Sequence, residues 1–226
     1  MAENPSTTSA DAERSSARRL ATRARLLEAA TVEIAERGYH ATSIEHIAER
    51  AGFTRGAFYS NFDSKEQLFA EALDDCRRVL LADLDVQLAA TSLPIETPDA
   101  IDPVGVQTAV EHILRGLPKD VTWYVLNVEA DLLAARDPAF AAMTRESASS
   151  FLDDLGRLVE RTVGEYGLRF TIESGQVIRV LFGYFSTALR EAVLEGRADE
   201  VWLSDAQQAS TVTRLLIAMV EPAPAA

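Results

Sequence analysis

Cysteine is nearly absent from this chain of 226 residues, in which Cys76 is the single one. A lone cysteine excludes an intrachain disulfide, as expected in a reducing compartment such as the cytoplasm. No apolar run approaches the ~18 residues that cross a bilayer, and the longest clear candidate covers only residues 180–189. The polar N-terminus has no apolar core of a secretory signal. We therefore expect a cytoplasmic protein that makes no membrane contact.

Histidine is also scarce, and none of its three copies has a metal-binding partner at a convincing spacing. No Glu-x-x-His pair is present, which argues against a di-iron helical bundle. Phosphate-binding glycine loops, nucleophile elbows and Cys–His arrangements are missing from the sequence as well. We therefore expect no catalytic residue, no metal and no cofactor, so an enzyme is not indicated.

Positive charge is in short supply, and its distribution along the chain is uneven. The net charge is −13, yet residues 1–60 contain eight Lys/Arg and eight Asp/Glu and are neutral. Five arginines occur between residues 14 and 25 without an acidic residue among them. A local basic cluster suits phosphate contact, whereas the acidic remainder would be repelled from a polyanion. We expect Arg18, Arg19 and Arg23 to contact phosphate; a merely solubilising tail is the alternative.

Residues 42–68 contain three helix starts and a tight turn. Thr42-x-x-Glu45 fits a capping box, and apolar residues follow it at helical spacing. Gly52 is suited to end that helix, and Thr54 to begin a second, short one. Two short helices joined by a glycine-containing turn are typical of a helix-turn-helix, whose second helix enters the major groove of DNA.

The second helix of this motif is expected to be small and rich in hydrogen-bond donors. Gly56 and Ala57 would let its backbone approach another surface closely, although glycine costs a helix about 1 kcal/mol relative to alanine. Arg55 and Tyr59 are the expected main contacts to base edges or phosphate. An ordinary helical hairpin with an exposed arginine and tyrosine is the alternative. The expected DNA-binding residues are Arg18, Arg19, Arg23, Thr42, Ser43, Thr54, Arg55, Gly56, Ala57, Tyr59, Ser60, Asn61 and Lys65.

Around this motif the chain resembles the tetracycline-repressor (TetR) family. The DNA-binding domain of that family has a pattern close to A-G-V-S-x-G-x-L-Y-x-H-F-x-S-K-E-x-L, and residues 51–68 read AGFTRGAFYSNFDSKEQL. The upstream segments AERGY (35–39) and ATSI (41–44) match as well. The similarity covers residues 20–70 and is specific, because many positions agree in register. The departures from the pattern are Phe53, Phe58 and Asn61.

The rest of the chain predicts helices only, with no β pattern and no internal repeat. A long helix is expected from Lys65 to about Ala90, followed by a proline-rich connector over residues 91–103. Further helices are expected at 104–116, 120–136, 138–166, 173–196 and 204–220. The predicted fold class is all-α, with a three-helix helix-turn-helix domain followed by a larger helical domain. The predicted boundaries are a disordered tail at 1–16, the DNA-binding domain at 17–64 and the second domain at 65–226.

Helices 120–136 and 173–196 are apolar nearly all round, which is typical of buried helices. The resemblance implies that the second domain binds a small-molecule effector and forms a homodimer through helices 138–166 and 173–196, although 204–220 could replace one of them. Gly183, Ser186 and Ala188 would allow close helix approach, unless they pack within one subunit. The candidate pocket residues, for which core packing is the alternative, are Trp123, Tyr124, Asn127, Phe151, Phe182 and Phe185.

Glu129 lies in a mostly apolar helix and needs a partner. Arg136 or a cationic ligand would provide one, and the salt bridge is the preferred interpretation. The resemblance implies ligand-controlled repression: a homodimer binds a near-palindromic DNA operator with half-sites about 34–36 Å apart, and an effector releases it by shifting helix 65–90. The alternative is a helical adaptor whose N-terminal domain docks a protein, and its binding would be insensitive to salt.

Overall fold

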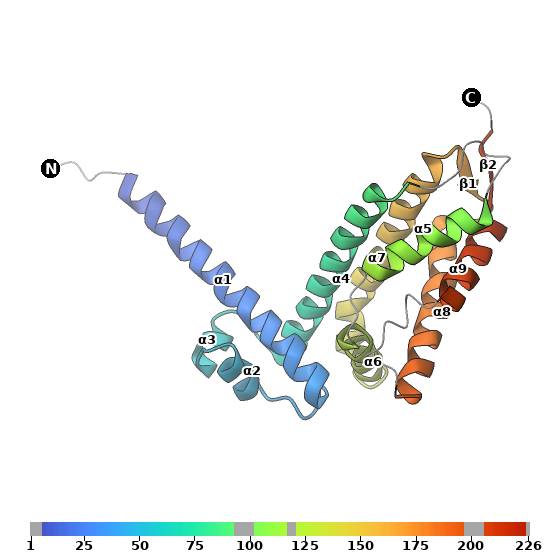
Figure 1. Ribbon diagram of the computed structural model, residues 1–226. Helices are drawn as coiled ribbons and strands as arrows, with labels where there is room; N and C mark the ends of the chain where they lie inside the picture. Colours follow the sequence, from blue (N-terminus) through green and yellow to red (C-terminus); the bar gives the residue numbers. More distant parts are fainter. Residues whose placement is uncertain (1–5, 93–101, 117–120, 197–205, 225–226) are drawn as a thin grey trace. The chain divides into compact units, whose positions relative to one another are not determined.

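The computed structural model describes residues 6–92, 102–116, 121–196 and 206–224, and its regular structure is almost entirely helical (Figure 1). The helices are α1 (Ser6–Arg37), α2 (Ile44–Arg50), α3 (Arg55–Tyr59), α4 (Lys65–Ala90), α5 (Pro103–Gly116), α6 (Thr122–Ala134), α7 (Pro138–Gly164), α8 (Ser174–Leu194) and α9 (Ala206–Ala218). The predicted all-α class is therefore confirmed. The prediction that the chain has no β structure is wrong, because two short strands, β1 (Leu168–Phe170) and β2 (Val220–Pro222), pair antiparallel.

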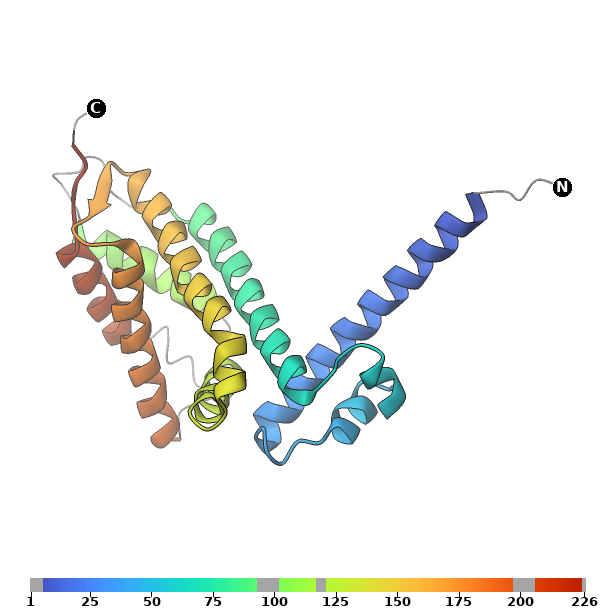
Figure 2. The same ribbon diagram turned by 180° about the vertical axis from the view of Figure 1, so that it is seen from behind.

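The N-terminal helix α1 is longer than the sequence predicts. A disordered tail was expected over residues 1–16, whereas α1 includes residues 6–16. This stretch has almost no apolar periodicity to signal a helix, but it contains no glycine or proline to interrupt one. In both views the N-terminal half of α1 extends past α2 and α3 (Figures 1 and 2). The side chains of residues 14–21 are accordingly exposed.

The helices form two compact units that do not follow the predicted boundary at residue 65. The first unit comprises Met1–Asp75 and Val125–Met143, and the second comprises Cys76–Tyr124 and Thr144–Ala226. The division passes through α4, α6 and α7, so each of these helices contributes residues to both units. The predicted connector lies mainly at residues 93–101, outside the described part of the chain.

The core of the first unit is built from the buried faces of α1 to α4 and from aromatic side chains. The Tyr39 ring, just after α1, stacks on Phe69 of α4 with ring centroids 5.2 Å apart. Phe69 in turn stacks on Phe140 of α7 at 5.6 Å. The fully buried side chains of this unit include Leu26, Ile34, Ile47, Phe58, Phe62, Leu68 and Leu73.

The second unit has its core between α5, α8, α9 and β1, with α5 packed on α9. Its buried members are Val106, Val110, Phe170, Val177, Ile178, Leu181, Ala209 and Val212. The backbones of α7 and α8 approach closely at Gly156, where an added Cβ would lie 3.0 Å from the nitrogen of Gly175.

Neither α6 nor α8 is buried all round in the single chain, contrary to the prediction from their apolar sequences. Leu132 of α6 is 46% exposed, and Val180 and Leu194 of α8 are 49% and 72% exposed. The small residues on α8 also differ in exposure. Gly183 and Ser186 are exposed, whereas Ala188 packs inside the second unit beside Val121 and Tyr124.

Candidate nucleic-acid interface

The first helix of the helix-turn-helix, α2, is capped one residue later than the sequence predicts. Ser43 is its N-cap: Ser43 Oγ accepts the backbone N–H of His46 at 3.2 Å, and the His46 ring accepts that of Ser43 at 3.4 Å. Thr42 is only 2% exposed, with its hydroxyl near the carbonyls of Glu33 and Gly38. The predicted capping box at Thr42 is therefore wrong, because that hydroxyl bonds inside the unit. The same burial keeps the Thr42 side chain from reaching DNA.

The turn between α2 and α3 follows the prediction. Gly52 has a φ of 71°, the left-handed conformation that glycine adopts without strain. The N–H of Phe53 then donates to the carbonyl of Ala48 at 2.8 Å and closes the turn. Thr54 begins α3 as its N-cap, with Thr54 Oγ1 accepting the N–H of Ala57 at 3.3 Å.

Aromatic side chains fix the inner side of α3. Phe58 is 0% and Phe62 is 1% exposed, and their ring centroids lie 5.8 Å apart. The Arg23 guanidinium lies 4.2 Å from the Phe62 centroid and contacts both the Asn61 carbonyl and the Glu71 carboxylate. This arginine therefore joins α1 to the end of α3 and to α4. The structure therefore places Arg23, which was predicted to contact phosphate, in an ion pair within the unit.

The outer side of α3 presents a polar surface. The Arg55 side chain is 61% exposed and Tyr59 is 49% exposed. Thr54, Gly56 and Ser60 are exposed beside them. A Cβ added at Gly56 would approach only Thr54 Oγ1, at 3.7 Å. No close contact in the described part of the chain therefore requires glycine at this position.

Asn61, a predicted contact residue just after α3, bonds back to the helix. The Asn61 amide donates to the carbonyl of Ala57 at 2.8 Å, and both residues are half-buried. Asn61 therefore caps the helix end, and the structure does not bring it to the exposed face.

Lys65 is also engaged within the first unit. Its ammonium donates to the carbonyls of Tyr39 and Thr42 at 2.9 and 2.8 Å, and it lies 4.0 Å from the centre of the Tyr39 ring. Burial lowers the pKa of Lys65 below the usual lysine value. The structure places this lysine, which was predicted to contact the DNA backbone, between the start of α4 and the α1–α2 loop.

The remaining basic candidates lie on α1. Arg18 and Arg19 are exposed, about one helical turn before Arg23. Arg25 lies over the ring of Phe53, with its guanidinium carbon 4.8 Å from the ring centre. Of the three arginines predicted to contact phosphate, Arg18 and Arg19 are the two with exposed side chains.

An acidic residue that the sequence analysis assigned to a helix cap lies beside the key arginine. Glu45 Oε1 of α2 is 2.7 Å from Arg55 Nη1, and Arg55 Nη2 donates to the Tyr59 hydroxyl at 3.3 Å. A backbone hydrogen bond and the Arg55 charge lower the pKa of Glu45, which therefore stays ionised at neutral pH. The contacts with Tyr59 and Glu45 raise the pKa of Arg55. No local pattern could have revealed this pair, because it joins two helices.

A family model of bacterial regulatory proteins, the tetR family, matches residues 26–72. This segment contains the C-terminal part of α1, the helix-turn-helix and the start of α4. Residues 26–72 thus carry the DNA-binding domain of the TetR family.

Curated relatives of this chain are named as transcriptional regulators. The transcriptional repressor KstR2 of Rhodococcus jostii (strain RHA1) is 36% identical over 88 residues, which are 35% of this chain and 43% of KstR2. The transcriptional activator FasR of Mycolicibacterium smegmatis is 28% identical over 142 residues, covering 63% of this chain and 60% of FasR. The chain thus matches less than two thirds of the length of either relative.

Solved structures extend the similarity of fold to most of the chain. A Mesorhizobium loti MAFF303099 protein assigned to the TetR family of transcriptional regulators superimposes with a TM-score of 0.67. The alignment covers 90% of this chain and 98% of that protein at 21% sequence identity. The two-part helical fold of this chain is therefore shared with that protein over most of its length.

Neither a metal site nor a membrane-spanning helix occurs among the described residues. Within those residues, no group of three or more His, Cys, Asp or Glu side chains could hold a metal ion. The helices in the same ranges are all too short or too polar to cross a membrane.

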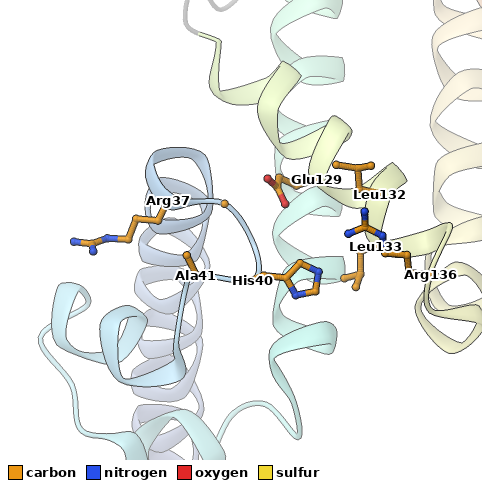
Figure 3. A pocket seen from close by; sticks show the side chains of 8 residues that line it. Arg37, His40, Ala41, Glu129, Leu132, Leu133 and Arg136 are labelled. Carbon is orange, nitrogen blue, oxygen red and sulfur yellow. The ribbon is translucent and has the colours of Figure 1, made fainter.

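A small cavity lies in the first unit, where α6 meets the end of α1. Its volume is about 290 Å³, and Figure 3 shows Glu129 of α6 reaching toward the segment after Arg37. Glu129 Oε2 accepts the backbone N–H of Tyr39 at 3.1 Å. No ion pair between Glu129 and Arg136 occurs in the described structure, so the salt bridge preferred from the sequence is corrected. The residues lining the cavity are Arg37, Gly38, His40, Ala41, Glu129, Leu132, Leu133 and Arg136.

The residues predicted to line an effector pocket are divided between the two units. Trp123, Phe151 and Phe182 form an aromatic row in the second unit, with centroid distances of 5.8 and 6.2 Å. Tyr124 and Phe185 pack against separate hydrophobic clusters of that unit. Asn127 belongs to the first unit. The aromatic row is thus the part of the predicted set that comes together.

Proposed function

We propose that this chain is a DNA-binding transcriptional repressor that reads its operator with α3 and acts as a homodimer. The observation that carries the proposal is the outer side of α3. Arg55 and Tyr59 project from it. Gly56 lies between them and has no side chain, although the fold has room for one. In helix-turn-helix proteins such a helix enters the major groove, where arginine binds guanine edges.

The basic face of α1 extends the proposed interface. Arg18 and Arg19 would contact phosphates beside the groove, in the only part of the sequence that is not acidic overall. Thr42, Lys65, Asn61 and Arg23 hold the helices in position rather than touching DNA. Ser43, half-buried at the start of α2, and Ser60 remain candidates for backbone contact.

The test is selection of a binding sequence from a randomised duplex library with the full-length protein. We expect enrichment of a near-palindrome, followed by loss of binding in Arg55→Ala and Tyr59→Ala variants that retain the helical circular dichroism spectrum. Affinity should fall steeply as salt is added. Failure to enrich any sequence, or binding that is insensitive to salt, would contradict DNA recognition and favour a protein-docking adaptor.

The homodimer is proposed to form through α7 and α8. Val180 and Leu194 are exposed apolar side chains on α8, and Gly183 and Ser186 leave its surface shallow enough for a second helix to approach. Sedimentation equilibrium should give twice the monomer mass for the wild-type protein. A Val180→Glu variant should sediment as a monomer, and a dimer of unchanged strength would move the interface elsewhere, with α9 the next candidate.

Release from DNA is proposed to follow binding of a small-molecule effector in the second unit. Its aromatic row would contact an apolar or aromatic part of the ligand. The effector would act by favouring one arrangement of α4 over another, which requires a different affinity for the two states. Mass spectrometry of material extracted from the purified protein tests for a bound molecule, and Trp123→Ala should lower its recovery. We expect the protein to act in the cytoplasm, where its operator is.

A further inference from the structure

The proposed DNA-reading surface contains a carboxylate, which is unexpected beside a phosphate polyanion. Glu45 is in the first turn of α2, and its side chain is 55% exposed. Glu45 Oε1 lies 2.7 Å from Nη1 of Arg55, the first residue of α3. The ion pair therefore bridges the two helices of the motif on their outer side.

Arg55 is held from a second direction as well. Its Nη2 donates to the Tyr59 hydroxyl at 3.3 Å, and the guanidinium carbon lies 5.5 Å from the Tyr59 ring centre. A guanidinium has five N–H donors, so donors remain for DNA after both contacts. The two partners restrict the direction in which those donors point.

The Glu45–Arg55 pair is poorly suited to hold the fold. Ion pairs between exposed side chains add little stability, and the packing of α2 on α3 already rests on Ile47 and Phe58, both 0% exposed. A carboxylate at this position does act on bound DNA, because it repels phosphates and competes with them for the arginine.

We propose that Glu45 is a specificity-determining residue, which aims Arg55 at one base and opposes its use as a general phosphate contact. This inference rests on the proposed function. On a matched operator Arg55 keeps its contact with Glu45 and directs its remaining donors at the acceptor atoms of a guanine. On unmatched DNA the arginine must leave Glu45 to reach a phosphate, and an uncompensated carboxylate is left beside the backbone.

The experiment compares Glu45→Gln with Glu49→Gln, which removes the same charge one turn further along α2. Dissociation constants are measured for the operator selected by the wild-type protein and for a random-sequence duplex of equal length, at three salt concentrations. Glu45→Gln should strengthen binding to the random duplex by about five-fold per subunit, the effect of one exposed charge. The preference for the operator should fall at least as much. Glu49→Gln should shift both duplexes by similar factors and leave the preference unchanged.

A second selection, performed with the Glu45→Gln variant, provides an independent readout. We expect one position in each half-site to lose its base preference, the same position that Arg55→Lys relaxes. An unchanged selected sequence together with an unchanged preference in Glu45→Gln overturns the inference while leaving DNA recognition intact. If the wild-type protein enriches no sequence at all, the proposed function itself fails.

Discussion

Two glycines of the helix-turn-helix differ in what a side chain would meet. Gly52 has a φ of 71°, and an added Cβ would lie 3.1 Å from a guanidinium nitrogen of Arg25. Gly56 is in α3, where an added Cβ would meet only Thr54 Oγ1 at 3.7 Å. The first glycine is therefore required by the fold, whereas the fold itself does not require the second.

Gly56→Ala should separate stability from DNA binding. We expect the free energy of unfolding to stay equal or to rise by up to ~1 kcal/mol, because alanine is the better helix former. Affinity for the selected operator should fall at least ten-fold, since the added methyl group meets the DNA. Urea unfolding and fluorescence anisotropy measure the two quantities. The control is Gly52→Ala, which should lose ~1–2 kcal/mol of stability through left-handed strain. A destabilised Gly56→Ala protein with normal affinity would contradict this division.

The ionisation of Glu33 is expected to make the stability of the fold depend on pH. Its side chain is 5% exposed and lies 2.6 Å from Arg50 Nε and 2.9 Å from Arg37 Nε. The hydrogen bond from Arg50 is the main cause that lowers the pKa of Glu33 below its usual value. The carboxylate therefore stabilises the fold fully above the unfolded-state pKa of ~4.3, and this contribution is lost as the pH falls through the lower folded-state pKa.

Glu33→Gln should lower the free energy of unfolding by about 1–3 kcal/mol at pH 7. It should also flatten the loss of stability on acidification below pH ~5, because the protonated carboxyl and the amide are both neutral. Denaturant unfolding between pH 3 and 7 measures both effects. Glu36→Gln is the matched control, since Glu36 contacts the same Arg50 but is 51% exposed; we expect a change of only about 0–1 kcal/mol there.

The helices α7 and α8 cross closely at Gly156, where the absence of a side chain lets their backbones approach. A Cβ at Gly156 would lie 3.0 Å from the nitrogen of Gly175 and 3.1 Å from the carbonyl carbon of Ser174, and both are backbone atoms that cannot rotate away. Gly156→Ala should therefore cost about 1–3 kcal/mol in thermal unfolding. Gly164→Ala in the same helix is the control, because nothing lies within 4 Å of its added Cβ. Equal stability of the two variants would show that the crossing can open without cost.

Helix boundaries and the helix-turn-helix could be predicted because their determinants are local. Thr54, Gly52 and the prolines act within a few residues, so their types alone indicate where helices begin and end. The cap at Ser43 was missed because Thr42 is equally suited by type, and only its bonds to α1 decide between the two. The pairing of β1 with β2 was missed for a similar reason, since strands of three residues carry no usable periodicity.

Some residues of the candidate site could be predicted from the sequence and others could not, again because only local determinants can be recognised in a sequence. Exposure of Arg55 and Tyr59 follows from their place on an amphipathic motif. The internal roles of Arg23 and Lys65 depend on partners more than 20 residues away in sequence. Charged residues near a DNA-binding motif look alike in sequence whether they contact phosphate or hold the motif together.

At the scale of the whole molecule, a dimer doubles every contact made by one subunit. Each phosphate neutralised changes the slope of log affinity against log salt by ~0.9. Arg18→Ala and Arg19→Ala should therefore each reduce the slope by about 1.8 in the dimer, with little effect on the selected sequence. Anisotropy titrations across a salt series measure the slope. Arg169→Ala on β1, which removes an equal charge from the second unit, should leave it unchanged. Equal slopes for all three variants would place α1 outside the interface.

The residues that form the first unit determine which fragments and chimeras of the protein keep an intact core. A fragment that ends at Asp75 would lose Phe140, on which Phe69 stacks, and Glu129, which accepts the Tyr39 N–H. A chimera that exchanges only the N-terminal segment between relatives would therefore join a DNA-reading motif to foreign supporting side chains. A chimera therefore has to exchange residues 125–143 together with the helix-turn-helix, because they complete the core that supports it.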